Sequence, residues 1–195
     1  MRKFSAHYIF TGTGVLLNKG IVVTTDQGVI TEIIDTNGAF EERSSVEFYS
    51  GIITPGFIDA NLTSDPLSPE VNLSESSHQK FTILDAVNAL VTNDLFTNAQ
   101  HGLQENRKIC IGLKSNTSND QEALFKLIKD LLLTFPMISL TQIITWATRN
   151  SAEALSISVR SGTIEVGKQP GLNLIGGLNM EILAIKSTST LKKLI

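Results

Sequence analysis

The sequence predicts an α/β fold, and three observations predict it. The first sixty residues alternate apolar and polar side chains with a period of two, which is typical of half-buried strands. The middle of the chain carries apolar side chains at helical spacing. The last forty residues return to short extended runs separated by Gly and Pro. Strands at both ends with a mixed segment between them indicate an α/β protein.

The N-terminal strands are predicted by alternation and by turn residues. Residues 4–10 alternate and predict one strand. The runs 21–25 and 29–34 flank a three-residue loop that ends in Gly28. Such a loop is typical of a hairpin with a bulge, because glycine adopts the left-handed conformation without strain. Residues 46–48 predict a further short strand before the chain turns away at a Pro-Gly pair.

The middle of the chain predicts helices and one buried strand. Residues 81–96 place apolar side chains at helical spacing and predict a helix. The short apolar run 109–111 predicts a buried strand. A stripe from Leu124 to Phe135 predicts a second helix that needs a partner surface. Asn119 and Glu122 have the spacing of a capping box at its start.

The remaining elements follow from caps and turns. Pro136 ends the helix, and Ser139 with Gln142 opens another one. Four extended pieces then predict strands at residues 163–167, 172–175, 182–186 and 190–195.

Composition and charge exclude several classes of protein. Hydrophobic residues make up 42% of the 195 residues and the net charge is −3, which excludes intrinsic disorder. The same charge argues against a nucleic acid partner, because phosphate contacts need surplus Lys and Arg. No apolar run reaches the ~18 residues of a membrane span, so no membrane partner is predicted. Cys110 is the only cysteine, and no signal peptide is recognisable, so we expect a cytoplasmic protein.

Two segments carry recognisable motifs. Residues 51–60 read GIITPGFIDA, and residues 146–155 read WATRNSAEAL, followed by SGTIEVGKQPG at 161–171. Together they resemble the amidohydrolase superfamily, the metal-dependent hydrolases that include nucleobase deaminases and chlorohydrolases. The resemblance implies a small composite β-sandwich built from residues 1–60 and 158–195. It also implies that residues 61–157 belong to a (β/α)8 barrel.

The family's metal ligands are replaced in this sequence. The family places His-x-His directly after the Asp-Ala pair, so that two imidazoles on one side of a strand hold a metal such as zinc or iron. Asn61 and Thr63 stand at these positions, and neither is a good ligand for a transition metal. Lys114 stands where the family's last barrel strand ends in a metal-binding Asp, and an ammonium repels a cation. We therefore predict no cofactor.

The length of the middle segment gives an independent argument. Asn61 to Asn150 spans 90 residues, whereas an eight-stranded barrel takes about 250 residues and at least about 200. At most two or three β/α units fit into this segment. The sequence therefore predicts a shortened α/β remnant of the barrel, in a truncated and degenerate member of the family.

Three hypotheses for function follow. The first is an amidohydrolase-like protein without its metal, in which hydrolysis or deamination of C–N bonds is lost because no metal lowers the pKa of water. The second is a non-catalytic interaction module that self-associates through the helix from Leu124 to Phe135. The third is a hydrolase with a rebuilt site near His78 and His101. Asp59, just before the replaced ligands, is a further weak candidate, and we expect it to bond local backbone groups.

Overall fold

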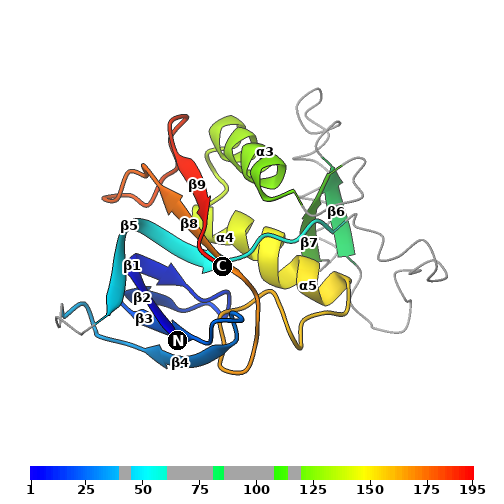
Figure 1. Cartoon of the computed structure of the whole chain (residues 1–195). Coiled ribbons are helices and arrows are strands. Elements are labelled where there is room, and N and C mark those ends of the chain that lie inside the picture. The colour runs from blue at the N-terminus through cyan, green and yellow to red at the C-terminus, as the bar shows by residue number, and fades with distance from the viewer. Residues whose placement is uncertain (40–44, 61–80, 86–107, 114–119) are drawn as a thin grey trace. The chain divides into compact units, whose positions relative to one another are not determined.

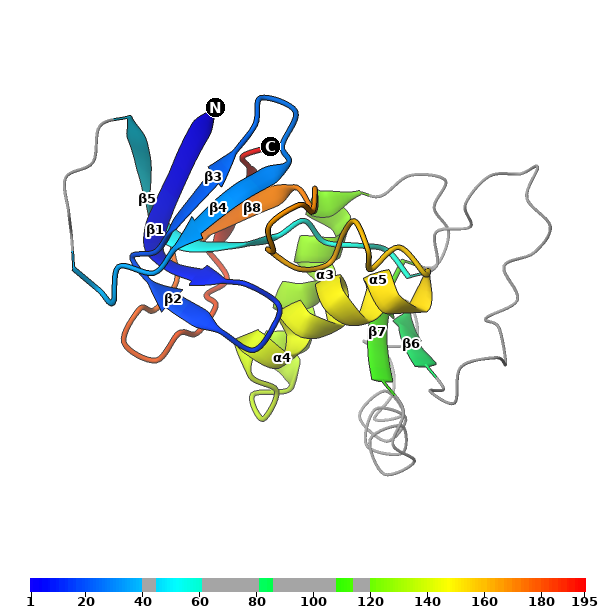
Figure 2. The same cartoon turned by 90° about the horizontal axis from the view of Figure 1, so that it is seen from below.

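The computed structural model describes residues 1–39, 45–60, 81–85, 108–113 and 120–195. The fold is mixed α/β, as the sequence predicts. The chain divides into two compact units, one formed by Met1–Gly56 with Val159–Ile195 and the other by Phe57–Ser158. Figures 1 and 2 show the elements of both units from two directions.

The first unit contains a seven-stranded sheet that joins both ends of the chain (Figure 1). Its strand order is β4-β3-β1-β5-β8-β9, and β2 also pairs with β1. The central strand β5 runs parallel to β1 and antiparallel to β8, so N-terminal and C-terminal strands share one hydrogen-bonded sheet. The strands are β1 (Arg2–Phe10), β2 (Leu16–Asn18), β3 (Ile21–Thr24), β4 (Ile30–Ile34), β5 (Val46–Pro55), β8 (Leu172–Gly176) and β9 (Thr190–Lys193).

The predicted N-terminal hairpin is confirmed in β3 and β4. Gly28 has a φ of +85°, and the register of the two strands shifts between Val23 and Thr24. The alternation of β1 sends Phe4 and Ala6 into the core of this unit, where Ile53 from β5 and Ile164 join them. Each large apolar side chain buried in this way contributes about 1.5–3 kcal/mol, so the alternating pattern fixes which face of the strand is covered.

A bulge interrupts the pairing of β1 with β5. Ala6 is opposite Tyr49 but Tyr8 is opposite Ile52, so His7 faces two residues of β5. The Nδ1 atom of His7 accepts a hydrogen bond of 3.2 Å from the backbone N–H of Gly51. Gly51 has a φ of +142°, and a Cβ atom there would lie 2.2 Å from the carbonyl oxygen of Ile175. Only glycine fits at this position of β5, which pairs with β1 on one side and with β8 on the other.

Two of the predicted C-terminal strands are wrong. Residues 163–167 form a turn between Gly162 and Gly167, and the φ of +88° at each glycine prevents regular pairing. This turn is still tied to the sheet, because the N–H of Ile164 donates to the carbonyl of Thr11 at 2.7 Å. Residues 182–186 also form no strand, since Leu183 has a φ of +49° and only an isolated bridge closes the turn. Strands β8 and β9 confirm the other two predictions.

The second unit combines a parallel strand pair with helices. The strands β6 (Phe81–Asp85) and β7 (Lys108–Gly112) pair in parallel, with Phe81 opposite Lys108. The predicted helix at residues 81–96 is therefore wrong over 81–85, and residues 86–96 lie outside the described part of the chain. A short apolar run has no periodicity that separates strand from helix, so pairing with β7 decides its conformation.

The helices of the second unit follow β7. They are α3 (Gln121–Thr134), α4 (Leu140–Thr145), the π-helix η1 (Trp146–Asn150) and α5 (Ser151–Ala154). Among the described helices, none combines the length and the hydrophobicity that a membrane crossing requires.

Helix α3 confirms the predicted apolar stripe, and it is capped within the run Ser118-Asn119-Asp120 that the sequence indicates, but by Asp120 and not by a capping box on Asn119. Asp120 is the N-cap, and its Oδ1 accepts hydrogen bonds of 3.1 Å from the backbone N–H groups of Glu122 and Ala123. The helix therefore starts one residue later than a capping box on Asn119 would require. The capping box of Ser139 and Gln142 at the start of α4 is confirmed. The stripe of α3 is buried at Leu124, Phe125, Leu127, Ile128 and Leu131.

Candidate functional site

The segment Phe57–Ala60 follows β5 and directly precedes Asn61, the first of the two positions where the resemblance places the family's metal ligands. All four of its residues are buried. The side-chain amide of Gln121, the first residue of α3, binds both backbone groups of Phe57. Its Oε1 accepts from the N–H of Phe57 at 2.8 Å, and its Nε2 donates to the carbonyl of Phe57 at 2.7 Å. The ring of Phe57 also stacks on the ring of Phe125, with 6.4 Å between the ring centroids. Helix α3 therefore contacts this segment through both polar and apolar groups.

The π-helix contacts the next residue of the segment. The N–H of Ile58 donates to the carbonyl of Ala147 at 2.7 Å. A π turn lengthens the spacing of the helical hydrogen bonds, which makes a helix carbonyl accessible to a donor outside the helix. The Oγ of Ser151 donates to the carbonyl of Trp146 at 2.8 Å, so a side chain also satisfies a carbonyl of this turn.

The end of the segment lies beside the carboxyl end of β7. The N–H of Ala60 donates to the carbonyl of Ile111 at 2.9 Å. The Oδ1 atom of Asp59, which is fully buried, accepts a hydrogen bond of 2.9 Å from the N–H of Leu113. We expected Asp59 to bond local backbone groups, and this partner is 54 residues away in sequence. A carboxylate that accepts from a buried amide makes a strong bond, so Asp59 fixes the ends of two chain segments together.

Most of the predicted site residues lie outside the described residues. They are Asn61, Thr63, His78, His101 and Lys114. Asn61 directly follows Ala60 in the sequence, and Lys114 directly follows Leu113.

The residues present at this site do not fit the family's metal. Among the described residues, no group of three or more His, Cys, Asp or Glu side chains could hold a metal ion. Asp59 supplies one carboxylate, and that carboxylate already binds the amide of Leu113. The amide of Asn61, the hydroxyl of Thr63 and the ammonium of Lys114 are a poor donor set for zinc or iron. No hydrolytic step through a metal follows from these residues.

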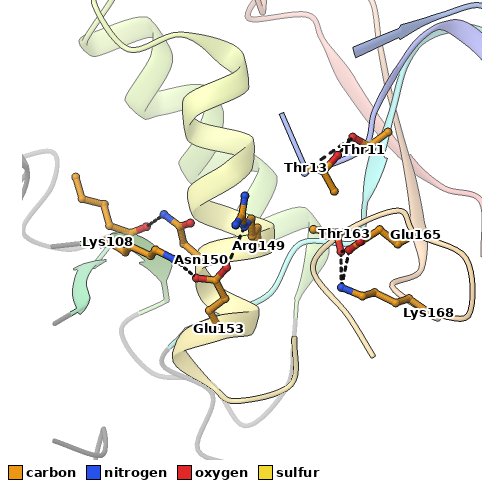
Figure 3. Close-up of polar contacts among 10 residues, drawn as sticks. Thr11, Thr13, Lys108, Arg149, Asn150, Glu153, Thr163, Glu165 and Lys168 are labelled. Carbon is orange, nitrogen blue, oxygen red and sulfur yellow. Dashed lines mark hydrogen bonds and ion pairs between the residues drawn. The ribbon is translucent and has the colours of Figure 1, made fainter. Parts of the chain in front are cut away.

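A charged cluster lies at the amino end of β7, where sequence reasoning predicted no site (Figure 3). The carboxylate of Glu153 binds Lys108 through Oε2 and the Nε of Arg149 through Oε1, the latter at 2.9 Å. Burial raises the pKa of Glu153, but the hydrogen bonds from Lys108 and Arg149 outweigh burial and leave the pKa below its ordinary value. The i,i+4 spacing of Arg149 and Glu153 is a sequence signal for their pair, whereas nothing local indicates Lys108.

Two further side chains beside this cluster, those of Asn150 and Cys110, have structural roles. The side-chain amide of Asn150 donates to the carbonyl of Ile109 at 2.8 Å. Burial, followed by the carboxylate of Glu153, raises the pKa of the Cys110 thiol to about 12. Cys110 is therefore an inert thiol at neutral pH, because the thiolate is the reactive form.

A second polar cluster belongs to the first unit (Figure 3). The ammonium of Lys168 donates to the Oγ1 of Thr163 at 2.7 Å and lies 2.6 Å from Oε2 of Glu165. The hydroxyl of Thr163 donates to the same carboxylate. Nearby, the hydroxyls of Thr11 and Thr13 lie 2.8 Å apart. These groups satisfy one another and stabilise the turn at 163–167, so we assign them no catalytic role.

Comparison with known proteins decides the family. The sequence profile of the Amidohydrolase family matches residues 73–194. The chain belongs to the amidohydrolase family. This confirms the resemblance to the family, and the matched residues include the second motif but not the first, at residues 51–60.

Two solved structures have a fold similar to that of this chain. A prolidase-like protein from Bifidobacterium longum aligns with a TM-score of 0.56 and 12% identity over 93% of this chain and 90% of that chain. Guanine deaminase from E. coli aligns with a TM-score of 0.51 and 7% identity over 90% of this chain and 88% of that chain. At these identities the similarity concerns the fold alone. No curated protein sequence matches the chain.

Proposed function

We propose that this amidohydrolase-family protein does not hold the family's catalytic metal and does not perform the metal-dependent hydrolysis of C–N bonds. The observation that carries the proposal is the replacement of the ligand positions by Asn61, Thr63 and Lys114. Without a metal, the pKa of water stays far above neutrality and no strong nucleophile forms at pH 7.

Elemental analysis of the full-length protein tests the proposal. The protein is purified from medium supplemented with zinc and iron, and metal content is measured after extensive buffer exchange. We expect far less than one metal ion per chain, together with no hydrolysis of a panel of purines, pyrimidines and small amides. One firmly bound zinc or iron per chain would refute the proposal.

Two variants make the elemental analysis specific. The triple variant N61H/T63H/K114D returns the family's ligand types to the three positions, and its metal content should exceed that of the wild type. If the wild type itself holds metal, H78A/H101A decides whether a rebuilt site is responsible. Loss of that metal in H78A/H101A would support the hypothesis of a hydrolase with a site near His78 and His101.

A second candidate function is self-association through helix α3. The apolar stripe of α3 is buried in the second unit at Leu124, Leu127, Ile128 and Leu131. Outside the stripe, Leu133 keeps 54% of its surface exposed, and Met137 in the following turn keeps 62%. These two large exposed apolar side chains offer a contact for a second copy. Light scattering after size exclusion should show a dimer at high concentration, and L133D should shift it to monomer. A monomer at every concentration would exclude this function.

A further inference from the structure

We propose that Gln121 is a positioning residue of the candidate site and that its amide sets the placement of the Phe57–Ala60 segment against β7. Gln121 uses a donor and an acceptor of one planar group on the two backbone groups of a single residue, at 2.8 and 2.7 Å. A neighbouring β-strand would offer Phe57 the same pair of partners. The side chain therefore takes the place of a strand beside this segment.

The amide of Gln121 is itself held in place. Gln121 is the first residue of α3, and the preceding Asp120 caps the helix through its bonds to Glu122 and Ala123. The fourteen residues of α3 are anchored by the buried stripe described above. We call the two hydrogen bonds from the Gln121 amide to the N–H and carbonyl of Phe57 the clamp. The clamp is made by a side chain on a packed helix, and a site held by such an element is placed accurately.

The clamp acts on the site through a short stretch of chain. Asp59 lies two residues after Phe57 and accepts from the N–H of Leu113 at 2.9 Å. Between them, Ile58 donates to the carbonyl of Ala147 at 2.7 Å. If the clamp is lost, the start of the segment is released, and the carboxylate of Asp59 moves relative to the amide of Leu113. The bond of Ile58 limits this movement but leaves Phe57 without its clamp.

The Leu113 amide reports on this placement. A hydrogen bond to a carboxylate moves the proton resonance of an amide downfield, and it responds to changes of a few tenths of an ångström. The full chain is labelled with ¹⁵N, and the Leu113 resonance is assigned by comparison with D59N, in which the acceptor loses its charge. We expect Q121A to move this resonance upfield, toward its position in D59N.

Two more variants separate positioning from simple loss of stability. Q121E keeps an acceptor for the N–H of Phe57 but loses the donor to its carbonyl, so its Leu113 resonance should lie between wild type and Q121A. Q142A makes the same chemical change at the start of α4, where Gln142 bonds Ser139, and it should leave the Leu113 resonance unchanged. If Q121A does not fold, Q121E gives the decisive comparison.

One result would overturn the inference. If Q121A or Q121E lowers the melting temperature but leaves the Leu113 resonance at its wild-type position, Gln121 only stabilises the unit. The inference rests on the proposed function in one respect, which is the location of the candidate site at the end of the Phe57–Ala60 segment and at the carboxyl end of β7. Because the amide readout does not depend on metal content, failure of the inference and failure of the proposed function give different results.

Discussion

Thr24 offers a sharp test of how polar groups are satisfied in the sheet of the first unit. Its side chain on β3 is fully buried, and its Oγ1 has no hydrogen-bond partner within the described part of the chain. Burying a hydroxyl without a partner costs roughly 1–3 kcal/mol. Valine has nearly the same shape as threonine and also favours strands, so T24V removes the hydroxyl without opening a cavity. We therefore expect T24V to stabilise the protein.

The expected rise in melting temperature depends on the length of the chain. A gain of at least about 1 kcal/mol raises the melting temperature of a protein of 150–250 residues by about 2–4 °C. Urea denaturation followed by circular dichroism measures the same gain as a higher midpoint with an unchanged slope. An unchanged slope matters, because it shows that the variant alters stability rather than the extent of unfolding.

Thr54 provides the matched control. It is also fully buried in this sheet, but its hydroxyl donates to the carbonyl of Pro55 at 3.0 Å. T54V should therefore destabilise the protein by about 1 kcal/mol, because a hydrogen bond is lost. If T24V and T54V shift the midpoint in the same direction, burial of an unpartnered hydroxyl is not the cause, and the reasoning is refuted.

Three other perturbations test the packing and electrostatics described above. G51A should prevent folding or cost several kcal/mol in thermal denaturation, because its Cβ meets the carbonyl of Ile175, whereas G14A, at a φ of +94° but with no atom within 4 Å of its Cβ, should cost only about 1–2 kcal/mol of backbone strain. Because the pKa of Glu153 is lowered, its ion pairs stabilise the protein above the ordinary glutamate pKa, and this stability is lost as pH falls through the folded-state pKa. E153Q should remove that part of the pH dependence, and an unchanged profile would contradict the assignment. Cys110 should resist iodoacetamide at pH 8 when folded and react in guanidinium; rapid labelling of folded protein would contradict its burial.

Local patterns in the sequence predicted elements whose causes are local. The hairpin around Gly28, the stripe of α3 and the capping box at Ser139 depend on residues within a few positions of one another. The strand at 81–85 was missed because the helical spacing of apolar residues over 81–96 indicated a helix, whereas pairing with β7, more than twenty residues later, decides the conformation of 81–85. The turn at 163–167 was missed because positive φ at its two glycines overrides the apolar residues between them.

The geometry of the candidate site could not be predicted for the same reason. The position of Asp59 was recognised from a motif, but its bond to Leu113 spans 54 residues. The clamp of Gln121 on Phe57 spans 64 residues, and a glutamine at the start of a helix carries no sequence signal for such a contact. Contacts between distant segments are set by the tertiary arrangement, which propensity and periodicity do not encode.

The described contacts of the Phe57–Ala60 segment are made by residues other than Asn61, Thr63 and Lys114. The contacts described for this segment come from the side chain of Gln121 and from backbone groups of Ala147, Ile111 and Leu113, the last of which donates to Asp59 within the segment. None of these contacts uses the side chains of Asn61, Thr63 or Lys114. We therefore predict that substitution at those three positions leaves the described contacts intact.

The same expectation applies to the ligand-restored variant. N61H/T63H/K114D should melt at the wild-type temperature when metal is removed by a chelator, because the anchoring bonds are unchanged. Added zinc should then raise the melting temperature of the variant only, since a ligand that binds the folded state stabilises it in proportion to its concentration relative to Kd. A metal-free variant that melts well below the wild type would show that the three positions also support the fold, which would contradict this expectation.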